Sequence, residues 1–173
     1  ALESGIAGSA DVILIPEIPY DINKIVEKIE DRKKQGKLFT IIVVAEGAKP
    51  KDGDVMVAKI VEDSPDPIRL GGIGNKLAND LEKLVDGREV RCTVLGHIQR
   101  GGPTCTFDRI LSTRYGVAAV ELINQGKFGS MVCLKGNEIT YDSLENVIGN
   151  NKNVDPEGEL VTVAKKIGIS FAD

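Results

Sequence analysis

Apolar and polar positions along the chain follow two alternating patterns. Residues 10–18 and 38–47 are apolar runs rich in β-branched side chains, and polar or turn-forming residues bound each run. Such short runs predict buried strands. Between them, apolar residues recur at helical spacing over 22–29, with Asp21 where a helix N-cap is expected and Gly36 where a helix ends. The pattern therefore predicts strand, helix, strand.

The alternation continues to the end of the chain. Helical spacing predicts two long helices and two short ones, and apolar runs predict two more strands. The helices fall within 72–87, 106–127, 143–149 and 157–169, and the strands within 89–97 and 130–140. Residues 48–72 contain three prolines and break this rhythm, which predicts an irregular loop with a short strand from Val55 to Val61.

Strands that alternate with helices of this length predict an α/β fold. Its β-α-β units give a parallel sheet with helices on both faces. The 173 residues are enough for one domain with a substantial core. In such sheets, ligands bind beyond the carboxyl ends of the strands, so polar residues at strand ends are the first candidates for a site.

Composition narrows the function without assigning it. The net charge is −4 with cationic residues dispersed, which argues against a nucleic-acid partner, and no apolar run approaches the roughly 18 residues of a membrane span. Cys92, Cys105 and Cys133 are odd in number and lack CxxC spacing, so we expect reduced thiols in a cytoplasmic protein. Residues 1–8 already resemble the interior of a helix, so we expect a piece of a larger protein.

Glu46 is the first candidate site residue. It follows the β-branched run Ile41–Val44 and Ala45, and Gly47 comes directly after it. This position is the strand tip at which ligands bind in α/β sheets. A loop carboxylate that caps a helix or pairs with a lysine would give the same sequence, and both interpretations remain open.

The segment Val90–Gly102 holds the second set of candidates. It contains His97, the chain's single histidine, between Arg91 and Arg100, and a pair of glycines closes it. Guanidinium groups bind phosphate bidentately, imidazole can donate to a phosphate or a sugar hydroxyl, and glycines allow backbone N–H groups to approach an anion. For His97 alone, a structural histidine is the more expected interpretation; for Arg91, His97 and Arg100 together, we favour anion binding over arginines that merely bridge acidic neighbours at a subunit contact.

Other patterns do not indicate a site. The run Arg69–Gly74 has G-G-x-G before a helix but lacks a preceding strand and the full dinucleotide fingerprint. Three lysines near residue 35 are explained by the helix dipole alone. The sequence shows no Ser–His–Asp order, P-loop or metal-binding cluster.

The run Arg91–Arg109, "RCTVLGHIQRGGPTCTFDR", matches a family signature: Arg, four residues, Gly-His, one residue, Gln-Arg-Gly-Gly, five residues, Asp-Arg. It resembles the 6-phosphofructokinase family. Further matching segments are "SGIAGSADVILIPEIPYD", "IIVVAEGA", "PDPIRLGGIG", "LKGNEI" and the closing "GISFAD". The resemblance implies that residues 1–173 are the C-terminal, sugar-phosphate-binding part of a parallel-sheet sandwich of the phosphofructokinase type.

The resemblance implies phosphoryl transfer to the 1-hydroxyl of fructose 6-phosphate in glycolysis. Glu46 matches the glutamate that hydrogen-bonds the sugar, and His97 and Arg100 match the pair that holds the sugar and its 6-phosphate. Arg91 matches an arginine that reaches the site of a neighbouring subunit in the family tetramer, so a homo-oligomer is implied. Asp11 and Lys37 align with an allosteric nucleotide site, although Gln35 supplies no second cation there.

The resemblance also implies what this chain lacks. The family's glycine-rich donor loop and catalytic aspartate precede the matching region, so no catalytic residue is expected here and these residues alone are expected to be inactive. The donor is ATP or pyrophosphate, and the span from Glu46 to Arg91 resembles the long bacterial group, which uses both. Mg²⁺ is expected mainly on the missing half and the donor.

Two rival interpretations come from other classes. A non-catalytic sugar-phosphate sensor or regulatory half on the same scaffold would keep the same four residues. A purely structural α/β subunit would leave the polar residues at the strand ends unexplained.

Overall fold

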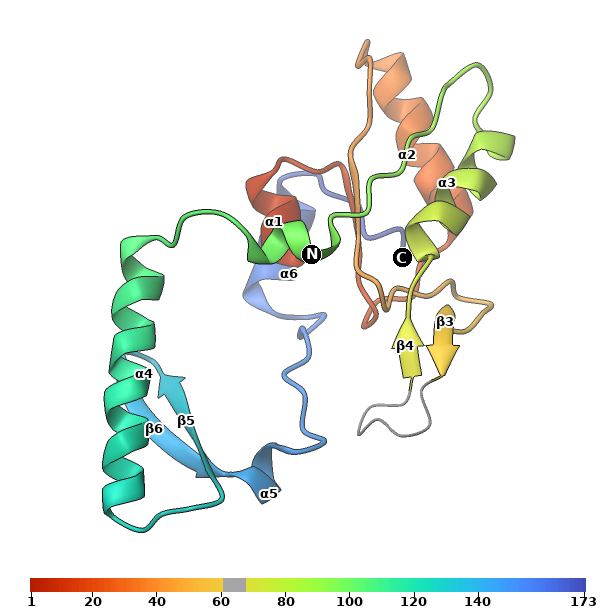
Figure 1. The fold of residues 1–173 in the computed structure, drawn as a ribbon. Helices are drawn as coiled ribbons and strands as arrows, with labels where there is room; N and C mark the ends of the chain where they lie inside the picture. The colour runs from red at the N-terminus through yellow and green to blue at the C-terminus, as the bar shows by residue number, and fades with distance from the viewer. Residues whose placement is uncertain (61–67) are drawn as a thin grey trace. The chain divides into compact units, whose positions relative to one another are not determined.

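The computed structural model describes residues 1–60 and 68–173 (Figure 1). The chain divides into two compact units. We call Ala1–Val94 with Val154–Asp173 the core unit, and Leu95–Asn153 the hairpin unit. The helices and strands of the core unit are α1 (Leu2–Ala7), β1 (Val12–Leu14), α2 (Ile22–Lys34), β2 (Ile42–Val44), β3 (Val57–Ile60), β4 (Ile68–Leu70), α3 (Ile73–Leu84) and α6 (Glu159–Lys166). Those of the hairpin unit are the 3₁₀ helix η1 (Gly96–Arg100), α4 (Thr106–Asn124), β5 (Ser130–Lys135), β6 (Glu138–Ser143) and α5 (Leu144–Val147).

A small parallel sheet lies at the centre of the core unit. β1 pairs in parallel with β2, with Val12 opposite Ile42 and Leu14 opposite Val44. Val12 also forms a parallel bridge with Ser170. β1 therefore has a neighbour on each edge, and all three of its residues are fully buried. The predicted strands in 10–18 and 38–47 are confirmed, although each is shorter than its apolar run, and β2 is only partly buried rather than buried.

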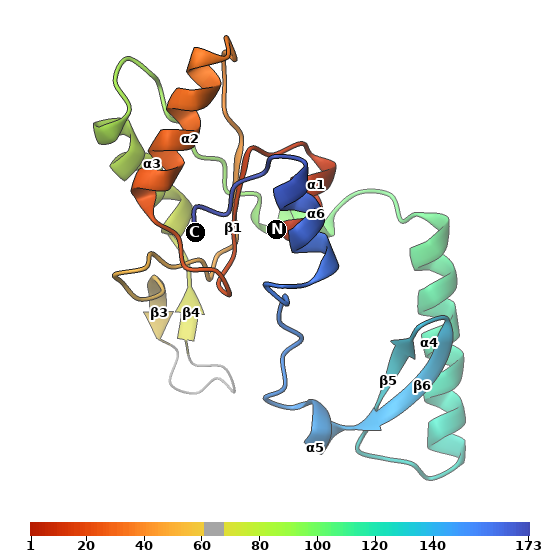
Figure 2. The same ribbon diagram turned by 180° about the vertical axis from the view of Figure 1, so that it is seen from behind.

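Side chains of β1 alternate between two hydrophobic clusters, as the period of two in a strand requires. Val12 and Leu14 pack with residues of α2 and α3. Ile13, together with Ile15 beyond the strand, packs with residues of α1 and α6. Figure 2 shows these two helix pairs on opposite sides of β1. The predicted α/β fold, with a parallel sheet and helices on both faces, is confirmed.

The local signals at the ends of α2 have the predicted roles. Asp21 has an extended backbone, and its carboxylate accepts a hydrogen bond of 2.8 Å from the N–H of Asn23. Such an N-cap satisfies one of the free N–H groups in the first turn. Gly36 follows the helix with φ +76°, a conformation that glycine adopts without a steric penalty.

The predicted loop at 48–72 contains an antiparallel pair of strands, of which the sequence predicted only the first. β3 falls within the predicted strand Val55–Val61, whose last residue lies outside the described residues. β4 was not predicted. It pairs with β3, with Val57 opposite Leu70, and leads directly into α3.

The single strand predicted at 130–140 is wrong, because this segment folds back on itself. β5 and β6 form an antiparallel hairpin in which Lys135 pairs with Glu138. The two residues between them are Gly136 and Asn137, and Gly136 has φ +61°. A left-handed glycine at the first turn position is typical of type II′ hairpin turns. The Gly-Asn pair within an apolar run was the signal for a turn.

The strand predicted at 89–97 is also absent. Residues 88–95, all of them described, form neither helix nor strand, and η1 begins at Gly96. Val94 and Leu95 are 69% and 52% exposed. An apolar run predicts burial, but a strand also needs a neighbour to hydrogen-bond, and no described strand pairs with this segment.

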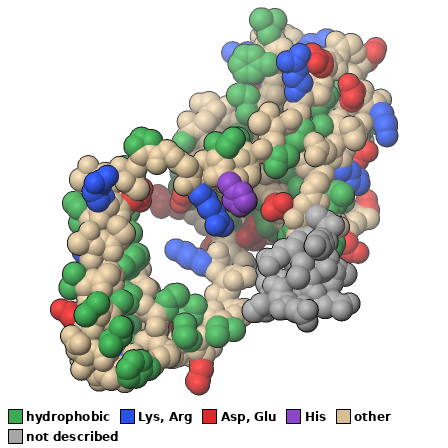
Figure 3. All heavy atoms as spheres, in the orientation of Figure 1, with side chains coloured by type: hydrophobic (Ala, Val, Ile, Leu, Met, Phe, Trp, Pro, Cys, Tyr) green, Lys and Arg blue, Asp and Glu red, His purple; other side chains and the backbone are tan. Residues whose placement is uncertain are grey.

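Helix α4 confirms the helix predicted within 106–127, but its apolar side chains are not covered. Of its nineteen residues, all described, Leu122 alone is buried. Figure 3 shows hydrophobic side chains gathered over α4 and the hairpin. The large exposed apolar residues of α4 are Phe107, Ile110, Val117, Val120 and Ile123.

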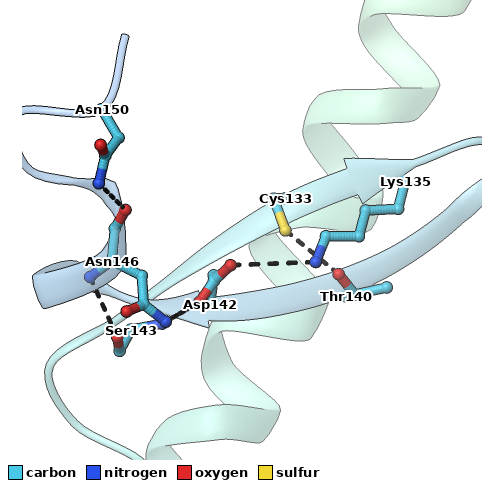
Figure 4. A network of polar contacts seen from close by, with 7 residues as sticks. All are labelled: Cys133, Lys135, Thr140, Asp142, Ser143, Asn146 and Asn150. Carbon is cyan, nitrogen blue, oxygen red and sulfur yellow. Dashed lines mark hydrogen bonds and ion pairs between the residues drawn. The ribbon is translucent and has the colours of Figure 1, made fainter. Parts of the chain in front are cut away.

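A network of polar contacts joins the end of the hairpin to α5 (Figure 4). The Asp142 carboxylate accepts hydrogen bonds from the backbone N–H of Ser143 at 2.9 Å and from Asn146 Nδ2 at 3.0 Å. The Ser143 hydroxyl in turn accepts from the N–H of Asn146 and caps α5. The Asn146 side chain contributes most to holding the pKa of Asp142 below its ordinary value, and the Ser143 N–H adds to it.

We predict that Asn146→Ala raises the pKa of Asp142 towards its ordinary value of 3.8, because the largest stabilising hydrogen bond is lost. A side-chain carboxyl NMR titration measures this. Ionised Asp142 stabilises the fold fully above pH 3.8, and this contribution disappears as the pH falls through the lower folded pKa. Asn150→Ala is the matched control, because Asn150 donates to the Asn146 carbonyl instead. Equal titration curves for Asn146→Ala and the unmodified chain would contradict the prediction.

Candidate functional site

Glu46 lies at the tip of β2, where the sequence predicted it. The strand ends at Val44, and a turn closed by a 2.9 Å hydrogen bond from the N–H of Ala48 to the Ala45 carbonyl follows. A Cβ on Gly47 would come within 3.2 Å of a Pro16 side-chain carbon, so a larger residue there would crowd the segment after β1. Glu46 itself is exposed, and none of the described side chains forms an ion pair with it.

Arg91 is exposed and bound to Glu89. Its Nε donates to Glu89 Oε1 at 2.8 Å and its Nη2 donates to Oε2 at 3.0 Å. This contact raises the pKa of Arg91 and lowers the pKa of Glu89, mainly through the side-chain hydrogen bonds. Arg91 therefore does pair with an acidic neighbour, which was one interpretation of the sequence, but this neighbour lies in its own chain and not across a subunit contact. Sequence reasoning missed Glu89, for which the spacing of two residues was the available signal.

Cys92, the residue after Arg91, shows where the segment around Arg91 lies relative to α3. The Sγ of Cys92 lies 3.0 Å from the position that a Cβ on Gly74 would occupy. Gly74 is in the first turn of α3, so the backbone around Arg91 passes closely over the N-terminal end of that helix. A side chain larger than hydrogen at Gly74 would push the segment away.

His97 and Arg100 both belong to η1. They are three residues apart, and in a 3₁₀ helix side chains at this spacing eclipse one another, so both project from the same side. Gly96 starts the helix with φ +52° and Gly102 follows it with φ +96°, conformations that favour glycine. The glycines flanking the pair therefore permit the turn that brings an imidazole and a guanidinium together.

The four predicted binding residues are divided between the two units. Glu46 and Arg91 lie in the core unit, whereas His97 and Arg100 lie in the hairpin unit. The members of the second pair share the short helix η1. Convergence of all four on one ligand stays a prediction.

Asp11, an expected effector residue, has a structural role. Its Oδ1 lies 2.6 Å from Arg32 Nη1, and its Oδ2 accepts a hydrogen bond of 2.8 Å from the N–H of Ile41. The side chains of Asp11 and Arg32 are only 12% and 18% exposed. The pair therefore ties the start of β1 to the last turn of α2 and to the segment before β2. Lys37 lies exposed after α2, and a role of Asp11 and Lys37 in effector binding stays untested.

The described residues contain no further candidate of two kinds, a metal-binding cluster or a membrane-spanning helix. Within 1–60 and 68–173, no group of three or more His, Cys, Asp or Glu side chains is arranged to hold a metal ion. In the same part of the chain, no helix combines the length and the hydrophobicity needed to cross a bilayer.

Comparisons with known proteins identify the family. The model of the family "Phosphofructokinase" matches residues 1–123. "ATP-dependent 6-phosphofructokinase 2" of Clostridium perfringens is 77% identical over 173 residues, which are all of this chain and 47% of the relative. "Pyrophosphate–fructose 6-phosphate 1-phosphotransferase" of Streptomyces coelicolor is 42% identical over 171 residues, 99% of this chain and 48% of the relative. The chain belongs to the phosphofructokinase family.

A solved structure agrees with this assignment. The phosphofructokinase of Pichia pastoris in its T-state is similar with a TM-score of 0.64 and 31% identity, covering 96% of this chain and 17% of that protein. The chain spans about half the length of the bacterial relatives that it matches. The resemblance seen in the signature Arg91–Arg109 is thereby confirmed at the level of the family.

We predict that Asp11→Ala lowers the free energy of unfolding by about 3 kcal/mol, because it leaves the largely buried guanidinium of Arg32 without its counter-charge. Urea denaturation measures the change. Asp31→Ala is the control: Asp31 pairs with Lys34 on the surface, where both side chains are more than half exposed, and its removal should cost less than about 1 kcal/mol. Equal losses for the two variants would show that the Asp11–Arg32 pair has no special role.

Proposed function

We propose that the full-length protein transfers a phosphoryl group from ATP or pyrophosphate to the 1-hydroxyl of fructose 6-phosphate, giving fructose 1,6-bisphosphate in glycolysis. The observation that carries this proposal is the pair His97 and Arg100 on one side of η1, within the Gly-His-x-Gln-Arg-Gly-Gly signature. This chain contributes sugar-phosphate binding, and the catalytic aspartate and donor loop belong to the part of the relatives that it does not span.

The proposed roles follow from the chemistry of each group. The guanidinium groups of Arg91 and Arg100 bind the 6-phosphate, since each presents a planar fork of donors to phosphate oxygens. The His97 imidazole donates to the sugar or its phosphate. The Glu46 carboxylate accepts hydrogen bonds from sugar hydroxyls. Phosphoryl transfer depends mainly on positioning and charge stabilisation, so these residues orient the 1-hydroxyl in line with the donor.

The longer chain is the proposed active species. α4 buries only Leu122 and leaves five large apolar side chains exposed, and apolar surface of this extent is typical of an interface. Relatives named for ATP and for pyrophosphate each match this chain over about half of their length, so the proposed donor is one of these two. Mg²⁺ would be held mainly by the remaining half and by the phosphoryl donor, where it would offset charge on the phosphates.

The proposal extends to assembly, location and regulation. The enzyme is a cytoplasmic homo-oligomer, a dimer or a tetramer, in which Arg91 reaches the site of a neighbouring subunit. The support for this comes from the family resemblance and from the exposed position of Arg91 on the core unit. Allosteric control through Asp11 is disfavoured, because both of its carboxylate oxygens are already engaged.

We predict that Arg100→Ala in the full-length protein raises the half-saturating concentration of fructose 6-phosphate about tenfold or more, since a hydrogen-bonded charged contact contributes about 1.5–3 kcal/mol. Arg100→Lys should give a half-saturating concentration between those of Arg100→Ala and the unmodified protein, because lysine keeps the charge but loses the planar fork. A coupled assay for fructose 1,6-bisphosphate measures saturation, and the 173-residue chain alone should show no turnover in it.

Lys152→Ala is the control for Arg100→Ala, since it removes an exposed cation of the same hairpin unit. Its saturation curve should match that of the unmodified protein. An unchanged curve for Arg100→Ala would remove Arg100 from the site.

A further inference from the structure

The contact between Glu89 and Arg91 occupies the group that the proposed function assigns to phosphate. Glu89 uses both carboxylate oxygens, at 2.8 Å from Arg91 Nε and 3.0 Å from Nη2. This edge of a guanidinium is one that binds oxyanions bidentately. Glu89 and Arg91 are two residues apart in a segment that forms neither helix nor strand, and their side chains meet there.

The pairing is selective within its segment. Arg88 is closer in sequence to Glu89, yet its Nη1 donates to the Leu38 carbonyl at 3.3 Å. Glu89 therefore has Arg91 as its cationic partner. The side chains of Arg91 and Glu89 are 81% and 68% exposed, so the other described residues of this chain do not enclose the pair.

Carboxylate and phosphate recognise the same donors. Both present two oxygens to the guanidinium fork, and a fork edge that holds one cannot hold the other. Exposed ion pairs are weakly held, because water and salt screen them. A phosphate group carries close to two negative charges at neutral pH, so it can displace a single carboxylate from Arg91.

We propose that Glu89 is an internal competitor that sets the affinity of Arg91 for the phosphate of the substrate. Without ligand, the Glu89 carboxylate holds the guanidinium fork. When the sugar phosphate binds, its oxygens replace those of Glu89, and the carboxylate returns to water. This inference rests on the proposed function, because it takes Arg91 to be a phosphate-binding residue.

The test is Glu89→Gln in the full-length protein. The amide keeps the shape of the side chain but removes the charge that competes with phosphate. The half-saturating concentration of fructose 6-phosphate should fall about two- to fivefold, which is the change in affinity that corresponds to the free energy of an exposed ion pair. In an Arg91→Ala background the same substitution should have no effect, because the shared guanidinium is gone. Glu82→Gln, which removes an exposed carboxylate of α3, is the charge-matched control and should leave saturation unchanged.

The outcomes distinguish the proposed phosphate-binding role of Arg91 from the proposed competition by Glu89. Arg91→Ala alone should raise the half-saturating concentration, and an unchanged value would remove Arg91 from the site and with it the basis of the inference. If Arg91→Ala weakens binding while Glu89→Gln leaves it unchanged or weakens it as well, the proposed function survives and the competition is refuted. A gain that persists in the Arg91→Ala background would show a general effect of charge, and this result too would overturn the proposal.

Discussion

The core unit depends on the burial of β1 from both faces. Its three residues are fully inaccessible, with Val12 and Leu14 turned to one hydrophobic cluster and Ile13 to the other. The helices on both sides therefore share one strand as the centre of their packing. A smaller residue in β1 would leave a cavity that neither helix pair could close without moving, and this is why such core positions are sensitive to truncation.

This constraint also determines where polar groups emerge. β2 is held in register against β1, so Val44 is opposite Leu14, and the chain leaves the sheet just before Glu46. Asp11 lies directly before β1, at the opposite end of the parallel pair, where its carboxylate contacts the Arg32 guanidinium and the N–H of Ile41. One end of the parallel pair is thus fastened by the ion pair beside β1, while the exposed carboxylate of Glu46 follows β2 at the other end. This asymmetry fits ligand binding beyond the carboxyl ends of parallel strands.

The sequence predicted those features that depend on local chemistry. The strands β1 and β2, the Asp21 cap, Gly36 and the long helix α4 follow from hydrophobic period and capping residues within a few positions of one another. It failed where partners decide the outcome. The apolar run around Val94 has no strand beside it among the described residues, and the turn at Gly136 was hidden inside a run that reads as one strand.

The candidate site shows the same limit. Glu46, Arg91, His97 and Arg100 were identified from residue type, position and family resemblance, and the eclipsed spacing in η1 adds a physical reason for pairing the last two. Hydrophobic periodicity does not register ion pairs: the spacing of Glu89 and Arg91 was an unused local signal, whereas the contact of Arg32 with Asp11 depends on how α2 packs beside the start of β1. Both pairs change how the predicted residues are interpreted.

The central claim is that a carboxylate, an imidazole and a guanidinium surround one phosphorylated sugar. A structure of the full-length protein with bound fructose 6-phosphate tests it most directly. The account predicts Glu46, His97 and Arg100 each within about 3 Å of the same ligand, at hydrogen-bonding distance. A sugar phosphate bound elsewhere, with these three side chains facing unrelated surroundings, would contradict it.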